Sequence, residues 1–168
     1  NNGFNDIHTN SGAVYLYSFS DDLSNGGVLQ AIIGDGYTGG KNYSQELRPI
    51  DYFGVSVSLD GNRLAVGSHG NDGFTNSSSA VGAVYLYQFT DSVFSNISLT
   101  SKIGFGYTGG KNYNLSTLNG SDQFGQSVSL DGTRLAVGAY AGDGSANILT
   151  DSGEVYLFTF TDLDFSGV

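Results

Sequence analysis

A seventeen-residue stretch occurs twice in this chain, and it constrains the fold more than any other feature of the sequence. Residues 51–67 have the sequence DYFGVSVSLDGNRLAVG and residues 122–138 have DQFGQSVSLDGTRLAVG, with fourteen of the seventeen positions identical. In the first copy, apolar residues alternate with glycine and serine, and in the second Gln126 replaces one of the apolar residues. In both copies, an Asp-Gly pair then precedes a second apolar run. This pattern predicts a β-hairpin, in which two antiparallel strands are joined by a short turn.

The rest of the chain repeats with the same period of 70 or 71 residues. The run VYLY at 14–17 returns at 84–87 and, as VYLF, at 155–158. The run GYTGGKNY at 36–43 returns unchanged at 106–113. One structural unit, repeated along the chain, therefore accounts for the whole sequence.

The complete unit predicts four antiparallel strands. They are expected near residues 53–59, 63–68, 83–89 and 96–103, separated by segments rich in glycine, asparagine and serine. Apolar residues nowhere recur with helical spacing over a useful length. Four antiparallel strands are the number found in one blade of a β-propeller.

The repeat divides the chain into three parts. Residues 1–50 form a partial blade with strands three and four and the GYTGGKNY loop, residues 51–121 form a complete blade, and residues 122–168 form a partial blade with strands one to three. We therefore predict an all-β fold of propeller-type blades, with about two and a half repeats of roughly 70 residues that belong to a larger propeller or assembly. The incomplete blades have open sheet edges, and open edges pair readily with other chains.

The third strand of the complete unit predicts a sheet that is covered on both sides. Val84 and Leu86 point to one face, while Tyr85, Tyr87 and Phe89 point to the other. Both sets are apolar or aromatic, so neither face of the strand is expected to be exposed to solvent. Glycine and serine on the first strand allow close approach of a neighbouring sheet. Stacked blades satisfy both conditions.

The start of each hairpin carries a family resemblance. Phe53-Gly54 and Phe124-Gly125 precede an alternating strand, a turn and a strand that ends in Val-Gly, so the chain resembles the FG-GAP repeat proteins. The resemblance implies a β-propeller of the integrin alpha-subunit type, in a cell-surface or secreted protein. In the integrin-like form, a calcium loop joins the two strands; here the turn at 59–62 is too short to surround a cation that takes six to eight oxygen ligands. The chain is thus more similar to the bacterial variants with a short hairpin.

Acidic residues also recur in the loop that follows each hairpin. Asp72 and Asp143 lie at equivalent positions, each beside glycine, and they are the candidate calcium ligands. Asp-Gly and Asn-Asp-Gly are also ordinary turn sequences, and the turn interpretation is the favoured one. In the hairpins themselves, Arg63 is expected to pair with Asp60, the simplest role for an arginine directly after the turn.

The GYTGGKNY loop is the candidate interaction site. Its eight residues are identical in both copies while the flanking residues differ, which predicts a shared role for Tyr37, Lys41, Tyr107 and Lys111 in contacts between blades or subunits. With the residues just before it, the loop also matches the glycine motif of dinucleotide-binding proteins. That motif requires a following helix, and none is predicted here, so we interpret the glycines as ordinary turn residues of a repeated loop.

Composition excludes several functions. Sixteen acidic and six basic residues give a net charge of -10, which opposes binding to nucleic acid or to an anionic membrane surface. No apolar run approaches the roughly 20 residues of a membrane-spanning helix, so membrane insertion is not expected. The chain has no cysteine and shows no catalytic motif, so we expect no enzyme activity, no catalytic residues and no required cofactor.

These observations favour a non-enzymatic extracellular or cell-surface protein with a structural or adhesive role. Its contacts are expected to be with a protein partner or with further copies of itself, through loops and open sheet edges. Two alternatives remain: a carbohydrate- or ligand-binding propeller that uses the tyrosine-bearing loops, and an accessory propeller part of a larger secreted enzyme.

Overall fold

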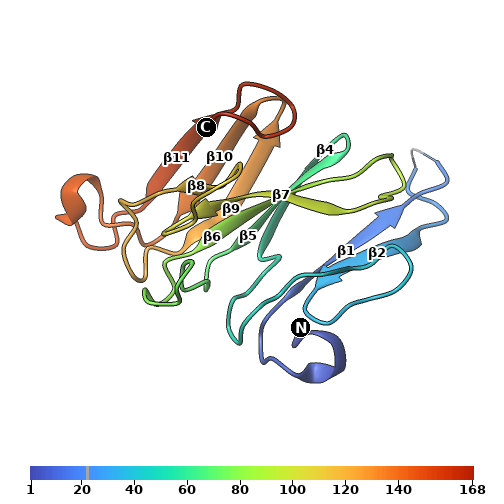
Figure 1. Cartoon of the computed structure of the whole chain (residues 1–168), viewed down its shortest axis with the longest axis horizontal. Coiled ribbons are helices and arrows are strands. Elements are labelled where there is room, and N and C mark those ends of the chain that lie inside the picture. The colour runs from blue at the N-terminus through green and yellow to red at the C-terminus, as the bar shows by residue number, and fades with distance from the viewer. Residues whose placement is uncertain (22) are drawn as a thin grey trace.

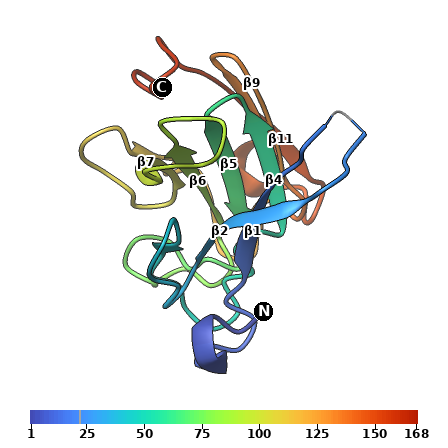
Figure 2. The same cartoon turned by 90° about the vertical axis from the view of Figure 1, so that its right-hand side faces the viewer.

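Each repeat of the sequence forms its own β-sheet in the structure, a computed structural model that describes residues 1–21 and 23–168. The three sheets lie side by side in chain order, as neighbouring blades of a propeller do (Figure 1). Seen from the side of the first sheet, they stand one behind another (Figure 2). The predicted all-β fold with propeller-type blades is therefore confirmed.

The strands follow the repeat closely. The first sheet contains β1 (Ala13–Ser18), β2 (Val28–Gly34) and β3 (Tyr43–Ser44). The second contains β4 (Ser56–Asp60), β5 (Arg63–Ser68), β6 (Ala83–Gln88), β7 (Ser98–Gly104) and β8 (Tyr113–Asn114). The third contains β9 (Phe124–Asp131), β10 (Arg134–Ala139) and β11 (Glu154–Thr159). Two short 3₁₀ segments, η1 (Phe4–Asp6) and η2 (Ser145–Asn147), lie in loops, and among the described residues no helix is long and apolar enough to span a membrane.

The middle blade has the four antiparallel strands that the sequence predicts, and it has a fifth strand besides. The two-residue strand β8 pairs with β7 in parallel, where the sequence predicts a loop. The side chain of Asn112 accepts a hydrogen bond from the backbone N–H of Lys102 at 2.8 Å, which holds the end of the GYTGGKNY loop against β7. Asn42 bonds the N–H of Ile32 at the same distance in the first sheet, so the extra strand belongs to the repeat.

The hairpin of the middle blade turns one residue later than the Asp-Gly pair suggests. Asp60 pairs with Arg63 in the strand register, so Gly61 and Asn62 form the turn. Gly61 has a φ of 56°, a left-handed conformation that glycine adopts without strain. Asp60 stays in the strand, where its carboxylate pairs with the guanidinium of Arg63 as predicted.

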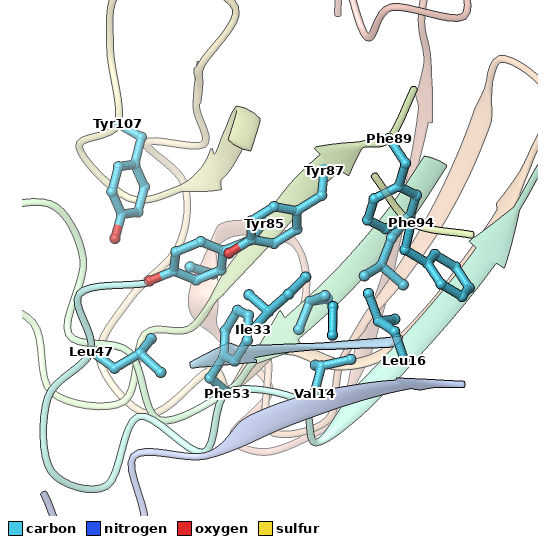
Figure 3. Packing of buried hydrophobic residues seen from close by; sticks show 14 residues of the cluster. Val14, Leu16, Ile33, Leu47, Phe53, Tyr85, Tyr87, Phe89, Phe94 and Tyr107 are labelled. Carbon is cyan, nitrogen blue, oxygen red and sulfur yellow. The ribbon is translucent and has the colours of Figure 1, made fainter. Parts of the chain in front are cut away.

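The first hydrophobic cluster fills the space between the first and second sheets. Val14 and Leu16 of β1 point toward Tyr85 and Tyr87 of β6, and the ring of Phe53 lies edge-on to both tyrosines (Figure 3). All five side chains are buried. We call the Val/Leu side of a blade its aliphatic face and the Tyr/Phe side its aromatic face.

The second cluster repeats this arrangement between the second and third sheets. Val84 and Leu86 provide the aliphatic face, and Phe158 of β11 and the partly buried Tyr156 lie on the aromatic face that packs against it. Phe124 is edge-on to both of these rings, as Phe53 is in the first cluster. The middle blade is thus covered on both sides, as its third strand predicts.

Candidate functional site

Polar side chains of the β4–β5 hairpin bind the backbone of the β9–β10 hairpin. The hydroxyl of Ser56 donates to the carbonyl of Gly125 at 2.8 Å, and the hydroxyl of Ser58 accepts from the N–H of Leu130 at 2.9 Å. The two serines are on alternate positions of β4, so both project toward the next blade. This contact recognises backbone rather than side chains, and it fixes one repeat to the next.

The turn of the same hairpin continues this contact. A carboxylate oxygen of Asp60 accepts from the N–H of Gly132 at 2.9 Å, and the Arg63 guanidinium donates to the carbonyl of Gly132 at 2.6 Å. Arg63 is only 7% exposed and also lies over the ring of Phe165 at 5.6 Å. The Asp60–Arg63 pair therefore binds both the N–H and the carbonyl of Gly132 in the neighbouring turn.

Glycine makes the close approach of the hairpins possible. A Cβ atom at Gly67 would lie 1.9 Å from the carbonyl oxygen of Gly125, so no larger residue fits there without separating the blades. The equivalent glycine of the third blade, Gly138, meets no such backbone; its Cβ would meet only the hydroxyl of Ser127. An open groove of about 280 Å³ lies at this place, lined by Ser127, Gly138, Gly153 and Val155 among others.

The last hairpin presents the same polar groups to solvent. Ser127 and Ser129 are exposed, and the paired side chains of Asp131 and Arg134 are 75% and 74% exposed. Their equivalents in the middle blade are the four side chains that hold the next hairpin. We call these four residues of the last hairpin the open hairpin site.

The lysines of the two GYTGGKNY loops bridge neighbouring blades. The ammonium of Lys41, in the first blade, donates to the carbonyl of Val93 in the second at 2.6 Å. Lys111, in the second blade, donates to the carbonyl of Asp164 in the third at the same distance. The shared sequence of the loops thus coincides with a shared contact between blades.

The tyrosines of these loops point elsewhere, into their own blades. Tyr37 packs edge-on against Phe4, and Tyr107 packs in the same way against Phe74. Tyr107 is only 5% exposed, and its hydroxyl donates to the side-chain oxygen of Asn71 at 3.0 Å. The structure therefore brings the four predicted loop residues together in pairs of different function: lysines between blades and tyrosines within them.

A largely buried polar network surrounds Tyr107, and Figure 3 shows two of its members, Tyr107 and Tyr85. Asn71 also bonds the hydroxyl of Tyr85 at 3.3 Å, and the ammonium of Lys102 lies 4.8 Å from the centre of the Tyr85 ring. Burial raises the pKa of Tyr85 and lowers that of Lys102. Burial also raises the pKa of the nearby Asp51 to about 6, although its carboxylate caps a turn by accepting the N–H of residue 48.

The two predicted metal ligands have structural hydrogen bonds. Asp72 accepts the N–H of Ala80 at 2.8 Å and Asp143 accepts the N–H of Asp151 at 2.9 Å, so each carboxylate closes a loop of the same length. Within residues 1–21 and 23–168, no three metal-binding side chains lie close enough to hold an ion together. The repetition of these aspartates is thus explained by loop closure, and calcium binding stays a prediction.

Sequence reasoning did not identify the serines of the hairpins as functional. Serine beside glycine on a strand usually indicates that another sheet approaches closely, and the sequence alone predicts no more than that for these residues. The available signal was their identity: Ser56 and Ser58 return as Ser127 and Ser129, on one side of the strand together with the Asp-Arg pair. A row of identical polar residues on one side of a strand indicates a shared partner.

Comparison with known proteins agrees with this repeat structure. The family model described as FG-GAP repeat matches residues 47–87 and 116–158, which together make up half of the chain. The chain therefore belongs to the FG-GAP repeat family. A search of curated proteins found no match.

Proposed function

We propose that this chain is a non-enzymatic repeat module of an extracellular or cell-surface protein, with a structural or adhesive role exerted through protein–protein contacts. FG-GAP repeats typically serve as propeller or protein-interaction modules, and they are commonly found in extracellular or surface proteins. The contacts are made by the hairpins, the loops and the uncovered parts of the sheets.

The open hairpin site is the observation that carries this proposal. In the middle blade, the equivalent side chains bind the backbone of another β-hairpin through four hydrogen bonds. Backbone recognition of extended segments is a common mode of protein–protein binding. At the last hairpin the four equivalent side chains are exposed to solvent. They lie beside a groove lined by Gly138 and Gly153, which would accept a Phe-Gly segment.

The alternative of a glycan-binding propeller has less support from the loop tyrosines. A sugar ring stacks on an exposed aromatic face, and Tyr107 is buried while its loop lysine is engaged by the next blade. A role as an accessory part of a larger secreted enzyme uses the same contact surfaces and differs only in the partner.

A designed β-hairpin ligand tests the proposal. The probe is a cyclised peptide with the sequence of residues 122–138, measured by calorimetry against the whole chain. We expect binding that falls at least about tenfold in the triple variant Ser129→Ala, Asp131→Ala, Arg134→Ala, because charge-assisted hydrogen bonds contribute most to such contacts. Thr75→Ala with Ser77→Ala, in an exposed loop, is the matched control and should bind normally.

The same preparations applied to a glycan array separate the alternatives. No binding of the hairpin peptide, or equal binding by the triple variant, would contradict the proposal. Glycan binding that is lost in the double variant Tyr37→Ala, Lys41→Ala would favour the carbohydrate-binding alternative instead.

A further inference from the structure

A polar pocket of about 280 Å³ opens between the first and second blades, beside the network around Tyr107. On the second blade it is lined by Tyr107 and by Lys102 of β7. The segment that joins the two blades contributes Glu46, Arg48 and Asp51 to its lining. Two basic and two acidic side chains therefore meet in one pocket within the repeat array.

The basic residues of the chain are few, and the pocket has two of them. Of the six, two bridge neighbouring blades and two pair with aspartates of the hairpins. The other two, Arg48 and Lys102, both line this pocket. Among the residues that the structure describes, neither side chain forms an ion pair or donates a hydrogen bond. A chain with a net charge of -10 thus gathers its unpaired basic side chains at one place.

The repeat itself does not require these two charges. Arg48 and Asn119 are equivalent, because the backbone N–H of each donates to the aspartate three residues further along. Lys102 and Ile32 are equivalent, because the N–H of each donates to the asparagine of the GYTGGKNY loop. An uncharged residue takes the same place in the other repeat, so the charges serve something other than the fold.

The ammonium of Lys102 is held in position without a hydrogen-bond acceptor among the described residues. It lies 4.8 Å from the centre of the Tyr85 ring and 5.3 Å from that of Tyr107, and such contacts orient a cation. Burial lowers the pKa of Lys102, and the carboxylates of Glu46 and Asp51 act in the opposite direction. A partly buried charge without an acceptor has an unfavourable free energy, which a bound carboxylate would offset.

The pocket also offers acidic and apolar groups to a ligand. Glu46 is exposed and has no ion-pair partner within residues 1–21 and 23–168. Phe74 lines the pocket with a ring that is 62% exposed and stands edge-on to Tyr107. Basic, acidic and aromatic groups are therefore available side by side.

We infer that this pocket binds a small zwitterion, an α-amino acid with an aromatic or other apolar side chain. Lys102 and Arg48 bind its carboxylate, Glu46 binds its ammonium, and the ring of Phe74 packs against its side chain. The carboxylates of the pocket oppose a purely anionic ligand, and the basic groups oppose a purely cationic one.

The size of the pocket agrees with this class of ligand. Sites for drug-sized ligands have volumes of roughly 300–1,000 Å³, and this pocket has about 280 Å³. Pockets in which a few polar groups and a side chain of shifted pKa converge are characteristic of binding sites. The site goes beyond the proposed protein-contact role and does not depend on it.

Titration of the whole chain with three matched probes, followed through its amide NMR shifts, tests the inference. L-phenylalanine carries both charges, 3-phenylpropanoate lacks the ammonium, and phenethylamine lacks the carboxylate. We expect saturable shifts at Phe74 and Lys102 with L-phenylalanine. The other two probes should bind at least about tenfold more weakly, because each lacks one charge-assisted contact.

Two variants remove one charge of the pocket each. Lys102→Met keeps an apolar stem without the ammonium, and Glu46→Gln changes an exposed side chain, so we expect both to fold, which circular dichroism checks. Each should weaken binding of L-phenylalanine by at least about tenfold. In Glu46→Gln, the preference for L-phenylalanine over 3-phenylpropanoate should also disappear. Asp151→Asn, which removes an exposed carboxylate outside the pocket, is the matched control and should bind as the wild type does.

Three outcomes would overturn the inference. Absence of saturation by L-phenylalanine at concentrations on the order of 10 mM would mean that the pocket is no amino-acid site. Equal binding of 3-phenylpropanoate would establish an anion site instead, and unchanged binding by both variants would place the ligand elsewhere. The hairpin-peptide test of the proposed function uses other residues, so its result is independent of all three.

Discussion

Arg63 donates a hydrogen bond across two blades to the backbone carbonyl of Gly132, 69 residues further along the chain, at 2.6 Å. The period of the repeat is 70 or 71 residues, so this bond joins the turn of one hairpin to the turn of the next. It shows how the repeat is held together: side chains that are identical in each copy bind the backbone of the following copy.

The two arginines of the hairpins should therefore differ in their effect on stability. Arg63→Ala removes an ion pair whose arginine is buried and whose aspartate is partly exposed, a hydrogen bond and a contact with an aromatic ring. We expect it to lower the free energy of unfolding by about 2–4 kcal/mol. Arg134→Ala removes only an exposed pair and should change it by less than about 0.5 kcal/mol. Urea denaturation measures both, and equal losses would contradict the different roles.

The glycines at the ends of the hairpins give a second matched pair. In Gly67→Ala the new Cβ would lie 1.9 Å from the Gly125 carbonyl and must move the backbone of the third blade. We expect a loss of roughly 1–3 kcal/mol. Gly138→Ala meets only the hydroxyl of Ser127, which can rotate away, so it should cost under about 1 kcal/mol. A thermal melt distinguishes them, and a harmless Gly67→Ala would show that the hairpins are not in close contact.

Stability should depend on pH through Asp51. Its carboxyl has a folded-state pKa of about 6, raised by burial, against roughly 3.9 in an unfolded chain. The folded state thus holds the proton more tightly. This contribution to stability is complete below about pH 4 and is lost as the pH rises through about 6, with a size on the order of 2–3 kcal/mol.

The variant Asp51→Asn isolates this effect, because an asparagine oxygen can still accept the N–H of residue 48. We expect the variant to match the wild type near pH 4 and to exceed its free energy of unfolding at pH 8 by on the order of 2–3 kcal/mol. Burial raises the pKa of Asp122 too, but that group is unchanged in the comparison. A difference between the two proteins that is the same at every pH would refute the burial argument.

The two loop tyrosines should also differ. The hydroxyl of Tyr107 donates to Asn71 in a buried place, whereas that of Tyr37 accepts a longer, exposed bond of 3.4 Å from Asn1. Tyr107→Phe is expected to cost about 1 kcal/mol and Tyr37→Phe less than about 0.5 kcal/mol. Chemical denaturation of the two variants side by side provides the measurement, and a more costly Tyr37→Phe would reverse the assignment.

Calcium should leave the stability of the chain unchanged if the aspartates of the loops serve only to close them. Asp72 already accepts a backbone N–H, as does Asp143. We expect the same melting temperature in excess EDTA and in millimolar calcium chloride. A rise with calcium that disappears in Asp72→Asn would instead establish the metal site, because a ligand that binds only the folded state stabilises it.

The sequence predicted most of the fold because each strand carries a strong local pattern. The alternation in residues 84–87 places both faces of β6 correctly, and the period places the three sheets. Strand β8 could not be predicted in this way, since two residues carry no pattern and its pairing depends on a side-chain bond from Asn112. The short turn was placed one residue early for a similar reason: the Asp60–Arg63 pair, and not the Asp-Gly dipeptide, decides where the strand ends.

The candidate site was only partly accessible from sequence. Identical loops pointed to Lys41 and Lys111, whose contacts do lie between blades, and the same reasoning extended to the tyrosines, which pack within their own blades. The serines of the hairpins were overlooked because their partners are backbone groups about 70 residues away. Identical residues in the two repeats indicate a shared contact, but they do not show that the partner is a backbone group of the next repeat.

Hydrogen exchange of four backbone amides, followed by NMR, tests the central claim that each hairpin is held by the one before it. The N–H groups of Leu130 and Gly132 donate to Ser58 and Asp60, so we predict slow exchange for both. Their equivalents, Leu59 and Gly61, lie in the β4–β5 hairpin, and among residues 1–21 and 23–168 no side chain accepts a hydrogen bond from either N–H. They should exchange rapidly, and equal protection of the two pairs would contradict the account.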